Sequence, residues 1–171
     1  MVDDQLLRDT GVPGVRPSDQ RALEIVAYDL PLFHGIPLCC DATLVSPLKA
    51  DGQPAHRSDA VPGSALVEAE RRKRRTYWEL ASGRHARLLV LGNEIGGRWS
   101  EDALAILPLL AEARARSAPR LLHGQIRGAL VARWSAMIAV TVQDAVAAGL
   151  SGEGCRGLCF PADAPPQWGE L

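Results

Sequence analysis

Two short apolar runs on either side of a helical segment constrain the fold most. Residues 38–45 and 87–92 consist mostly of apolar residues, which is typical of β-strands. The second run is unbroken, and this predicts a strand that is buried on both faces. The segment over residues 62–80 begins with a proline that suits the first turn of a helix. The sequence therefore predicts a strand–helix–strand unit.

One more strand and two more helices complete the predicted domain. Residues 22–28 are rich in β-forming side chains, and Ser100 is a suitable cap for a helix over residues 101–116. The last helix is predicted over residues 119–149. The order of these elements indicates an α/β fold with a small mixed sheet flanked by helices and a long C-terminal helix.

The composition also places the boundaries of the domain. Proline and glycine in residues 1–20 predict an irregular lead-in, so the domain is expected to cover residues 21–150. Residues 151–171 are rich in Gly and Pro and are expected to form a flexible tail. Residues 136–148 are apolar nearly all round, which predicts that this part of the last helix is buried.

The overall composition is that of one globular domain, with 171 residues of which 47% are hydrophobic and 23% charged. No unbroken apolar run reaches the ~20 residues of a membrane span, so no membrane partner is expected. The N-terminus lacks a basic region of the kind that opens a signal peptide, and four cysteines do not make a disulfide framework. An intracellular, reducing compartment is therefore expected.

The charged residues are segregated along the chain. Residues 71–133 hold 13 basic and five acidic residues, whereas the rest of the chain holds six basic and 15 acidic ones. This split predicts one continuous positive face that contacts a polyanion. A second interpretation stays open, because 17 of the 19 basic residues are arginine and GC-rich coding bias produces the same preference.

One lysine differs from the four arginines around it. The apolar stripe of the helix over residues 62–80 consists of Leu66, Ala69, Tyr77 and Leu80. Lys73 falls in the middle of this stripe. Four arginines point away from it: Arg71, Arg72, Arg74 and Arg75. A lysine on the inner face of a helix either extends its ammonium group to solvent or meets a carboxylate.

Two carboxylates lie within apolar strand sequence. Asp41 shares a face of its strand with Cys39 and Thr43, because side chains alternate along a strand. Glu24 lies inside a second apolar run and is likewise expected to face inward. With Lys73, these two acids either satisfy one another or bind a hard divalent cation such as Mg²⁺ beside a reacting phosphate.

These residues resemble the motif of a nuclease family. Leu23-Glu24, then Asp41-Ala42-Thr43-Leu44-Val45, then Lys73-Arg74-Arg75-Thr76-Tyr77 are similar to the restriction-like endonuclease domain of non-LTR retrotransposons. That domain is a branch of the PD-(D/E)XK nuclease superfamily. In this branch an acid opens one strand, Asp-x-x-x-Val lies on the next strand, and Lys-x-x-x-Tyr lies on the following helix. The stretches CCDATLVSPL, AERRKRRTY and VLGNEIGGRWS also resemble the C-terminal parts of retrotransposon polyproteins, and the resemblance covers residues 20–150.

The resemblance implies a restriction-endonuclease-like core and a metal-dependent endonuclease that nicks target DNA for retrotransposon insertion. Glu24 and Asp41 would bind Mg²⁺ or Mn²⁺, and Lys73 would act as a third catalytic residue that stabilises developing charge. The implied partners are DNA, an upstream reverse-transcriptase domain and retrotransposon RNA, and the implied location is the nucleus.

Five arginines are expected to hold the DNA backbone: Arg71, Arg72, Arg74, Arg75 and Arg98. Glu94, just after the strand over residues 87–92, either faces the site or only opens the following turn. Two alternatives to a nuclease stay open, namely a non-catalytic nucleic-acid-binding module on the same fold and a decayed fragment of a mobile element. Magnesium-dependent nicking of DNA separates the nuclease from both.

Overall fold

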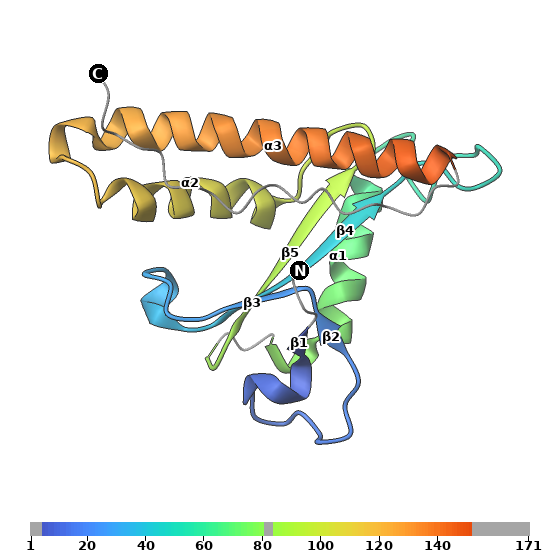
Figure 1. Cartoon of the computed structure of the whole chain (residues 1–171). Helices are drawn as coiled ribbons and strands as arrows, with labels where there is room; N and C mark the ends of the chain where they lie inside the picture. Colours follow the sequence, from blue (N-terminus) through green and yellow to red (C-terminus); the bar gives the residue numbers. More distant parts are fainter. Residues whose placement is uncertain (1–4, 81–83, 152–171) are drawn as a thin grey trace.

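The computed structural model describes residues 5–80 and 84–151 (Figure 1). The strands are β1 (Gln5–Leu6), β2 (Ala22–Leu23), β3 (Ile25–Ala27), β4 (Leu38–Val45) and β5 (Arg87–Glu94). The helices are α1 (Ser64–Thr76), α2 (Glu101–Ala115) and α3 (His123–Ser151). Short 3-10 turns lie at Leu7–Thr10, Phe33–Gly35, Trp78–Leu80 and Arg120–Leu122.

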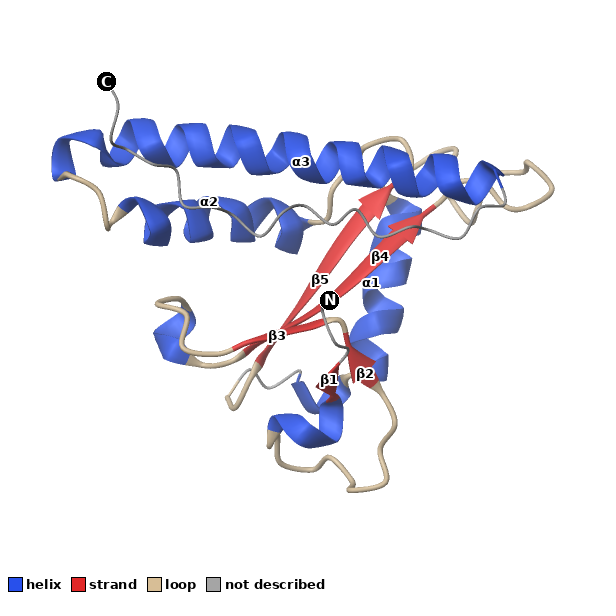
Figure 2. Ribbon diagram, viewed as in Figure 1, coloured by secondary structure: helices blue, strands red, loops and turns tan. Residues whose placement is uncertain are grey.

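Strands β3, β4 and β5 form a mixed sheet in that order. β3 pairs antiparallel with β4, with Ile25 opposite Cys40, and β4 pairs parallel with β5, with Asp41 opposite Val90. Helix α1 makes the connection between the two parallel strands (Figure 2). The predicted α/β fold with a small mixed sheet and a long C-terminal helix is therefore confirmed.

Buried side chains cover both faces of the sheet. On the α1 side they include Leu23, Cys39, Tyr77, Leu88 and Val90, and on the α2 side they include Leu38, Leu89 and Ile106. β5 lies at the edge of the sheet, yet it is buried on both faces as the sequence predicts, because α1 and α2 both pack against it. The site described below lies on the α1 side.

Two predicted elements are interrupted in the structure. The strand predicted over residues 22–28 is divided into β2 and β3, with Glu24 as the single residue between them. The helix predicted over residues 62–80 begins at Ser64 and ends at Thr76, and a 3-10 turn follows it. Gly63, at a φ of 83°, precedes the first residue of α1, which explains why the helix does not start at Pro62.

The N-terminal segment is more regular than the predicted lead-in. Gln5 of β1 pairs antiparallel with Leu23 of β2, and Leu7 is fully buried in the α1-side cluster. The proline and glycine content of residues 1–20 suggests loops. A strand of two residues is too short to show the alternating pattern by which strands are recognised in a sequence. The domain thus begins before residue 21. Apart from Ser151, the predicted tail over residues 151–171 lies outside the described residues.

Helix α3 is not buried, contrary to the prediction for residues 136–148. Residues 123–149 are all partly or fully exposed, and Val140 is among the exposed ones. Figure 1 shows that α3 runs beside α2 and extends past its end. With 29 residues against 15, α3 is roughly 43 Å long and α2 only about 22 Å, so much of α3 has no helix to pack against.

Length and composition alone would allow one described helix, Arg120–Gly149, to cross a membrane, with a mean hydropathy of 1.2. A search for unbroken apolar runs misses this helix, because its hydropathy is high only as an average over many residues. It is weak evidence of a membrane span, because it rests on length and composition alone.

The buried position of Leu7 gives a first testable prediction. Leu7→Ala removes a fully buried side chain from the α1-side cluster and should lower the free energy of unfolding by about 3 kcal/mol. Leu121→Ala, at a side chain that is 96% exposed, is the control and should change it by less than about 0.5 kcal/mol. Urea unfolding measures both. Equal effects would mean that the N-terminal segment is not part of the core.

Candidate functional site

The centre of the candidate site is an ion pair between β4 and α1. Nζ of Lys73 lies 2.8 Å from Oδ2 of Asp41. The Asp41 side chain is only 4% exposed and that of Lys73 is 28% exposed, so the pair lies at the border of the core. Asp41 faces α1 because it alternates with Cys40 along the strand, and Lys73 faces β4 because it shares a helix stripe with Leu66. The sequence predicts both orientations.

The buried oxygen of Asp41 is incompletely satisfied. Oδ2 has no hydrogen-bond partner among the described residues, since the contact with Lys73 has the distance of an ion pair without the angles of a hydrogen bond. A carboxylate oxygen accepts more than one bond, and burial without them costs free energy. Oδ2 therefore retains capacity for a further cation or donor.

Glu24, the residue between β2 and β3, binds the backbone of β4 next to Asp41. Its Oε2 accepts a hydrogen bond of 3.0 Å from the backbone N–H of Ala42, the residue after Asp41. The β3–β4 pairing ends at Ile25 and Cys40, and continuing this register by one residue would place Glu24 opposite Asp41. Glu24 is exposed, which contradicts the prediction that it faces inward, because the break between β2 and β3 turns it out of the apolar pattern.

Tyr77 follows the last residue of α1, one helical turn after Lys73. Its hydroxyl donates a hydrogen bond of 2.5 Å to the carbonyl of Ala22. Burial raises the pKa of Tyr77 to about 12, and the nearby charges of Asp41 and Glu24 add to this effect. The phenol therefore stays neutral and fastens the end of α1 to β2. The Lys-x-x-x-Tyr spacing is the sequence signal for this residue.

Arg21 holds the segment before Glu24 against the end of α1. Its guanidinium donates to the carboxylates of Asp19 and Glu79 and to the carbonyl of Thr76. These bonds raise the pKa of Arg21, and its charge lies 5.9 Å from the centre of the Tyr77 ring. Sequence reasoning does not find Arg21, because nothing in a lone arginine shows that acids 2 and 58 residues away surround it.

The five arginines predicted to hold DNA divide into two groups. Arg74 pairs with Asp102 at 2.7 Å, and Arg98 pairs with the buried Glu94 at 3.2 Å. The other three are exposed and form no ion pair with any described residue: Arg71, Arg72 and Arg75. Arg74 and Arg98 are therefore engaged within the fold, which the sequence does not indicate.

Glu94 does not join Asp41. It lies four residues beyond Val90, the residue opposite Asp41, which is roughly 13 Å along β5. Its carboxylate instead binds Arg98 at the turn that follows the strand. Of the two interpretations of Glu94, the structure supports a role in the turn.

The basic residues from Arg71 to Arg133 do not lie together. One group is carried by α1, and another lies at the α2–α3 turn, which Figure 1 places at the far end of the helical hairpin. In the second group Glu112 lies within 3.9 Å of Arg116 and 3.8 Å of Arg127. The charge split in the sequence therefore corresponds to separate regions of the molecule instead of the one predicted face.

Asp41 and Glu24 do not by themselves form a complete metal site. No group of three or more His, Cys, Asp or Glu side chains among the described residues is placed to hold a metal ion. The described residues therefore do not form a site in which protein side chains supply all the ligands of a metal ion. Mg²⁺ is often bound through one or two carboxylates, with waters and substrate phosphate as its other ligands. Asp41 and Glu24 are two carboxylates at this part of β4, and the Oδ2 atom of Asp41 has no hydrogen bond from a described residue.

Comparison with protein-family models, with curated proteins and with solved structures finds no match to this chain. The function proposed below rests on the residues and contacts around Asp41 and Lys73.

The ion pair gives a second testable prediction. Lys73→Met leaves the buried Asp41 without its cation and should lower the free energy of unfolding by about 3 kcal/mol. Asp41→Asn should lower the free energy of unfolding by a smaller amount, because the more exposed Lys73 can turn its ammonium group to solvent. The double variant should recover most of the loss, since it buries no unpaired charge. Urea unfolding at pH 7 measures this cycle, and strictly additive effects would show that the two side chains do not interact.

Proposed function

We propose that this chain is a metal-dependent phosphodiesterase that nicks DNA. The observation that carries the proposal is the contact of 2.8 Å between the buried Asp41 carboxylate and the Lys73 ammonium, with Glu24 bound to the next residue of the same strand. Asp41 lies on β4, Lys73 lies on α1, and Glu24 lies between β2 and β3; together they combine oxygen ligands that a hard cation prefers with a fixed positive charge. The motif resemblance to retrotransposon endonucleases supports the same function.

Glu24 and Asp41 are the residues that would hold the cation, Mg²⁺ or Mn²⁺. The chemistry that such an ion supplies is stabilisation of the negative charge that develops on the phosphate during hydrolysis. Asp41 suits this role because its Oδ2 atom is buried and lacks a hydrogen bond. Glu24 suits it because its position is fixed by the N–H of Ala42 while its side chain remains accessible.

Lys73 is the catalytic cation of the proposal. In the free protein its ammonium balances the charge of Asp41, and a bound phosphate would give the same ammonium a second anionic partner. A lysine provides a compact charge on a thin stem, whereas an arginine is broader and planar. Lys73 lies in the helix stripe between Ala69 and Tyr77, both of which are buried.

The biological setting is part of the proposal and rests on the motif resemblance alone. The proposed substrate is the target DNA of a retrotransposon, nicked at the start of insertion in the nucleus. The proposed partners are a reverse-transcriptase domain and the retrotransposon RNA. A restriction-endonuclease-like core is proposed on the same ground, and the β3–β4–β5 sheet with α1 as its crossover is compatible with it.

A second candidate is a non-catalytic nucleic-acid-binding module. The observation in its favour is that Asp41 and Lys73 neutralise each other and that the described residues contain no group of three metal ligands. In such a module the acids would act only as structural residues, and the exposed arginines of α1 would supply the binding.

Nicking of supercoiled plasmid tests the proposed function. The wild type should produce open-circular DNA with Mg²⁺ and none with EDTA. Asp41→Asn, Lys73→Ala and Lys73→Arg should each lower the rate by at least about 100-fold, because each removes charge or geometry from the reacting phosphate. Asp144→Asn, at an exposed acid on α3, is the matched control and should nick like the wild type.

Unfolding measurements on the same preparations separate lost chemistry from lost structure. Nicking that survives in folded Lys73→Ala protein would contradict the proposal. DNA binding without nicking in the wild type would favour the binding module, and the absence of both would favour a decayed fragment.

A further inference from the structure

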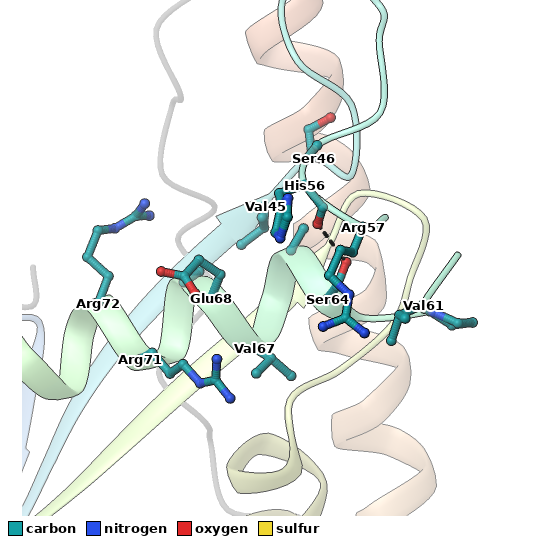
Figure 3. A pocket seen from close by; sticks show the side chains of 14 residues that line it. Val45, Ser46, His56, Arg57, Val61, Ser64, Val67, Glu68, Arg71 and Arg72 are labelled. Atoms are coloured by element: carbon teal, nitrogen blue, oxygen red, sulfur yellow. Dashed lines mark hydrogen bonds between the residues drawn. The ribbon is translucent and has the colours of Figure 1, made fainter. Parts of the chain in front are cut away.

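A second concave region lies beside the candidate site. It is a pocket of about 800 Å³ between the end of β4, the loop over residues 46–63 and the N-terminal half of α1 (Figure 3). Val45, on the same face of β4 as Asp41, contributes to its wall. Ala69, one turn before Lys73 on α1, contributes to the opposite wall. The pocket therefore lies between the same two elements, β4 and α1, that carry the ion pair.

The pocket is lined by positive charge that the protein does not neutralise. Arg57, Arg71 and Arg72 all line it, all are exposed, and none forms an ion pair with another described residue. Glu68 is the one acid among the lining residues, and it is not within ion-pair distance of these arginines. By contrast, Arg74 on the same helix is neutralised by Asp102. Unpaired guanidinium groups around a concave surface favour an anionic ligand.

The loop over residues 46–63 is held so that Arg57 stays near the start of α1. The Ser64 hydroxyl donates to the carbonyl of His56 at 3.2 Å and contacts the hydroxyl of Ser58, also at 3.2 Å. Arg57 has a φ of 61°, a left-handed conformation that is unfavourable for a side chain other than glycine, asparagine or aspartate. Figure 3 shows Arg57 beside Ser64, with Arg71 extending along α1 toward the same end.

The length of β4 between Asp41 and the pocket residue Val45 is compatible with a bound nucleic-acid strand. Asp41 and Val45 are four residues apart on β4, which is roughly 13 Å. Successive nucleotides rise about 3.4 Å along a DNA strand, so a strand covers this distance in about four nucleotides.

We propose that this pocket binds a phosphodiester group of the DNA strand whose scissile phosphate lies at Asp41 and Lys73. Arg57, Arg71 and Arg72 are its phosphate contacts. Arg57 lies outside the basic segment of the chain and is a new member of the DNA-binding surface. The inference rests on the proposed function for its substrate, and it adds the direction in which the strand leaves the site.

Two substitutions each remove one of the three arginines without a structural penalty. Arg57→Gly places glycine at a positive φ that glycine adopts freely, and Arg71→Ala places the best helix former within α1. Both variants should keep the stability of the wild type or exceed it. Arg16→Ala, at an exposed residue outside the pocket lining, removes one positive charge elsewhere and is the matched control.

Fluorescence anisotropy with a labelled DNA duplex in EDTA measures binding without cleavage. Arg57→Gly and Arg71→Ala should each weaken binding by about threefold to tenfold and lower the slope of log K against log salt by about 1. Arg16→Ala should bind within about twofold of the wild type. Unchanged binding by Arg57→Gly, or an equal loss in Arg16→Ala, would overturn the inference.

Competition with inorganic phosphate identifies the source of the ligand. Millimolar phosphate should not displace the duplex if the pocket binds phosphodiester within a strand, whereas full displacement would overturn the inference in favour of a free phosphate ligand. The same experiments distinguish failure of the pocket proposal from failure of the nuclease proposal. Plasmid nicking by the wild type with unchanged DNA binding by Arg57→Gly refutes the pocket alone, and weakened binding by Arg57→Gly without any nicking refutes the nuclease alone.

Discussion

The contact between Asp41 and Lys73 is the interaction on which the site depends. A buried carboxylate is costly unless a charge or donor balances it, and among the described residues the contact recorded for its Oδ2 atom is the Lys73 ammonium. The pair fixes the face that β4 presents to α1. One turn further along the helix, Tyr77 is held against Ala22, and this brings the strand break at Glu24 to the same place. The ion pair is thus both a packing constraint and the proposed chemical centre.

Periodicity places Lys73 and Asp41 on inward faces, but it leaves open whether the ammonium group reaches solvent or meets the carboxylate. A lysine in the middle of an apolar stripe and an acid in the middle of an apolar strand each need a partner, and the strand–helix connection makes each the nearest candidate for the other. The bounds of β4 also agree with the prediction, because Ser46-Pro47 ends the strand clearly. The Arg21 cluster escaped prediction because it joins Asp19 and Glu79, whose proximity is created by tertiary packing.

Sequence periodicity does not predict burial or charge pairing correctly where these depend on which other element lies against a surface. The apolar sequence of α3 predicts burial, but a helix about twice as long as its neighbour α2 is left uncovered over much of its length. The same limit applies to the arginines of α1. Arg74 and Arg75 are adjacent and chemically identical in the sequence, yet only Arg74 meets an acid, Asp102, from the start of α2. Charge counts along a chain therefore do not show which charges remain unpaired in the fold.

Mn²⁺ binding measured by electron paramagnetic resonance tests the central claim most directly, because it reports on the carboxylates without requiring DNA or turnover. The account predicts that the wild type binds Mn²⁺ and that Asp41→Asn abolishes this binding. Glu24→Gln should weaken it by about tenfold or more, since one of two carboxylate ligands is lost. Asp144→Asn should leave it unchanged. Equal Mn²⁺ binding by the wild type and Asp41→Asn would contradict the assignment of Asp41 and Glu24 as a divalent-cation site.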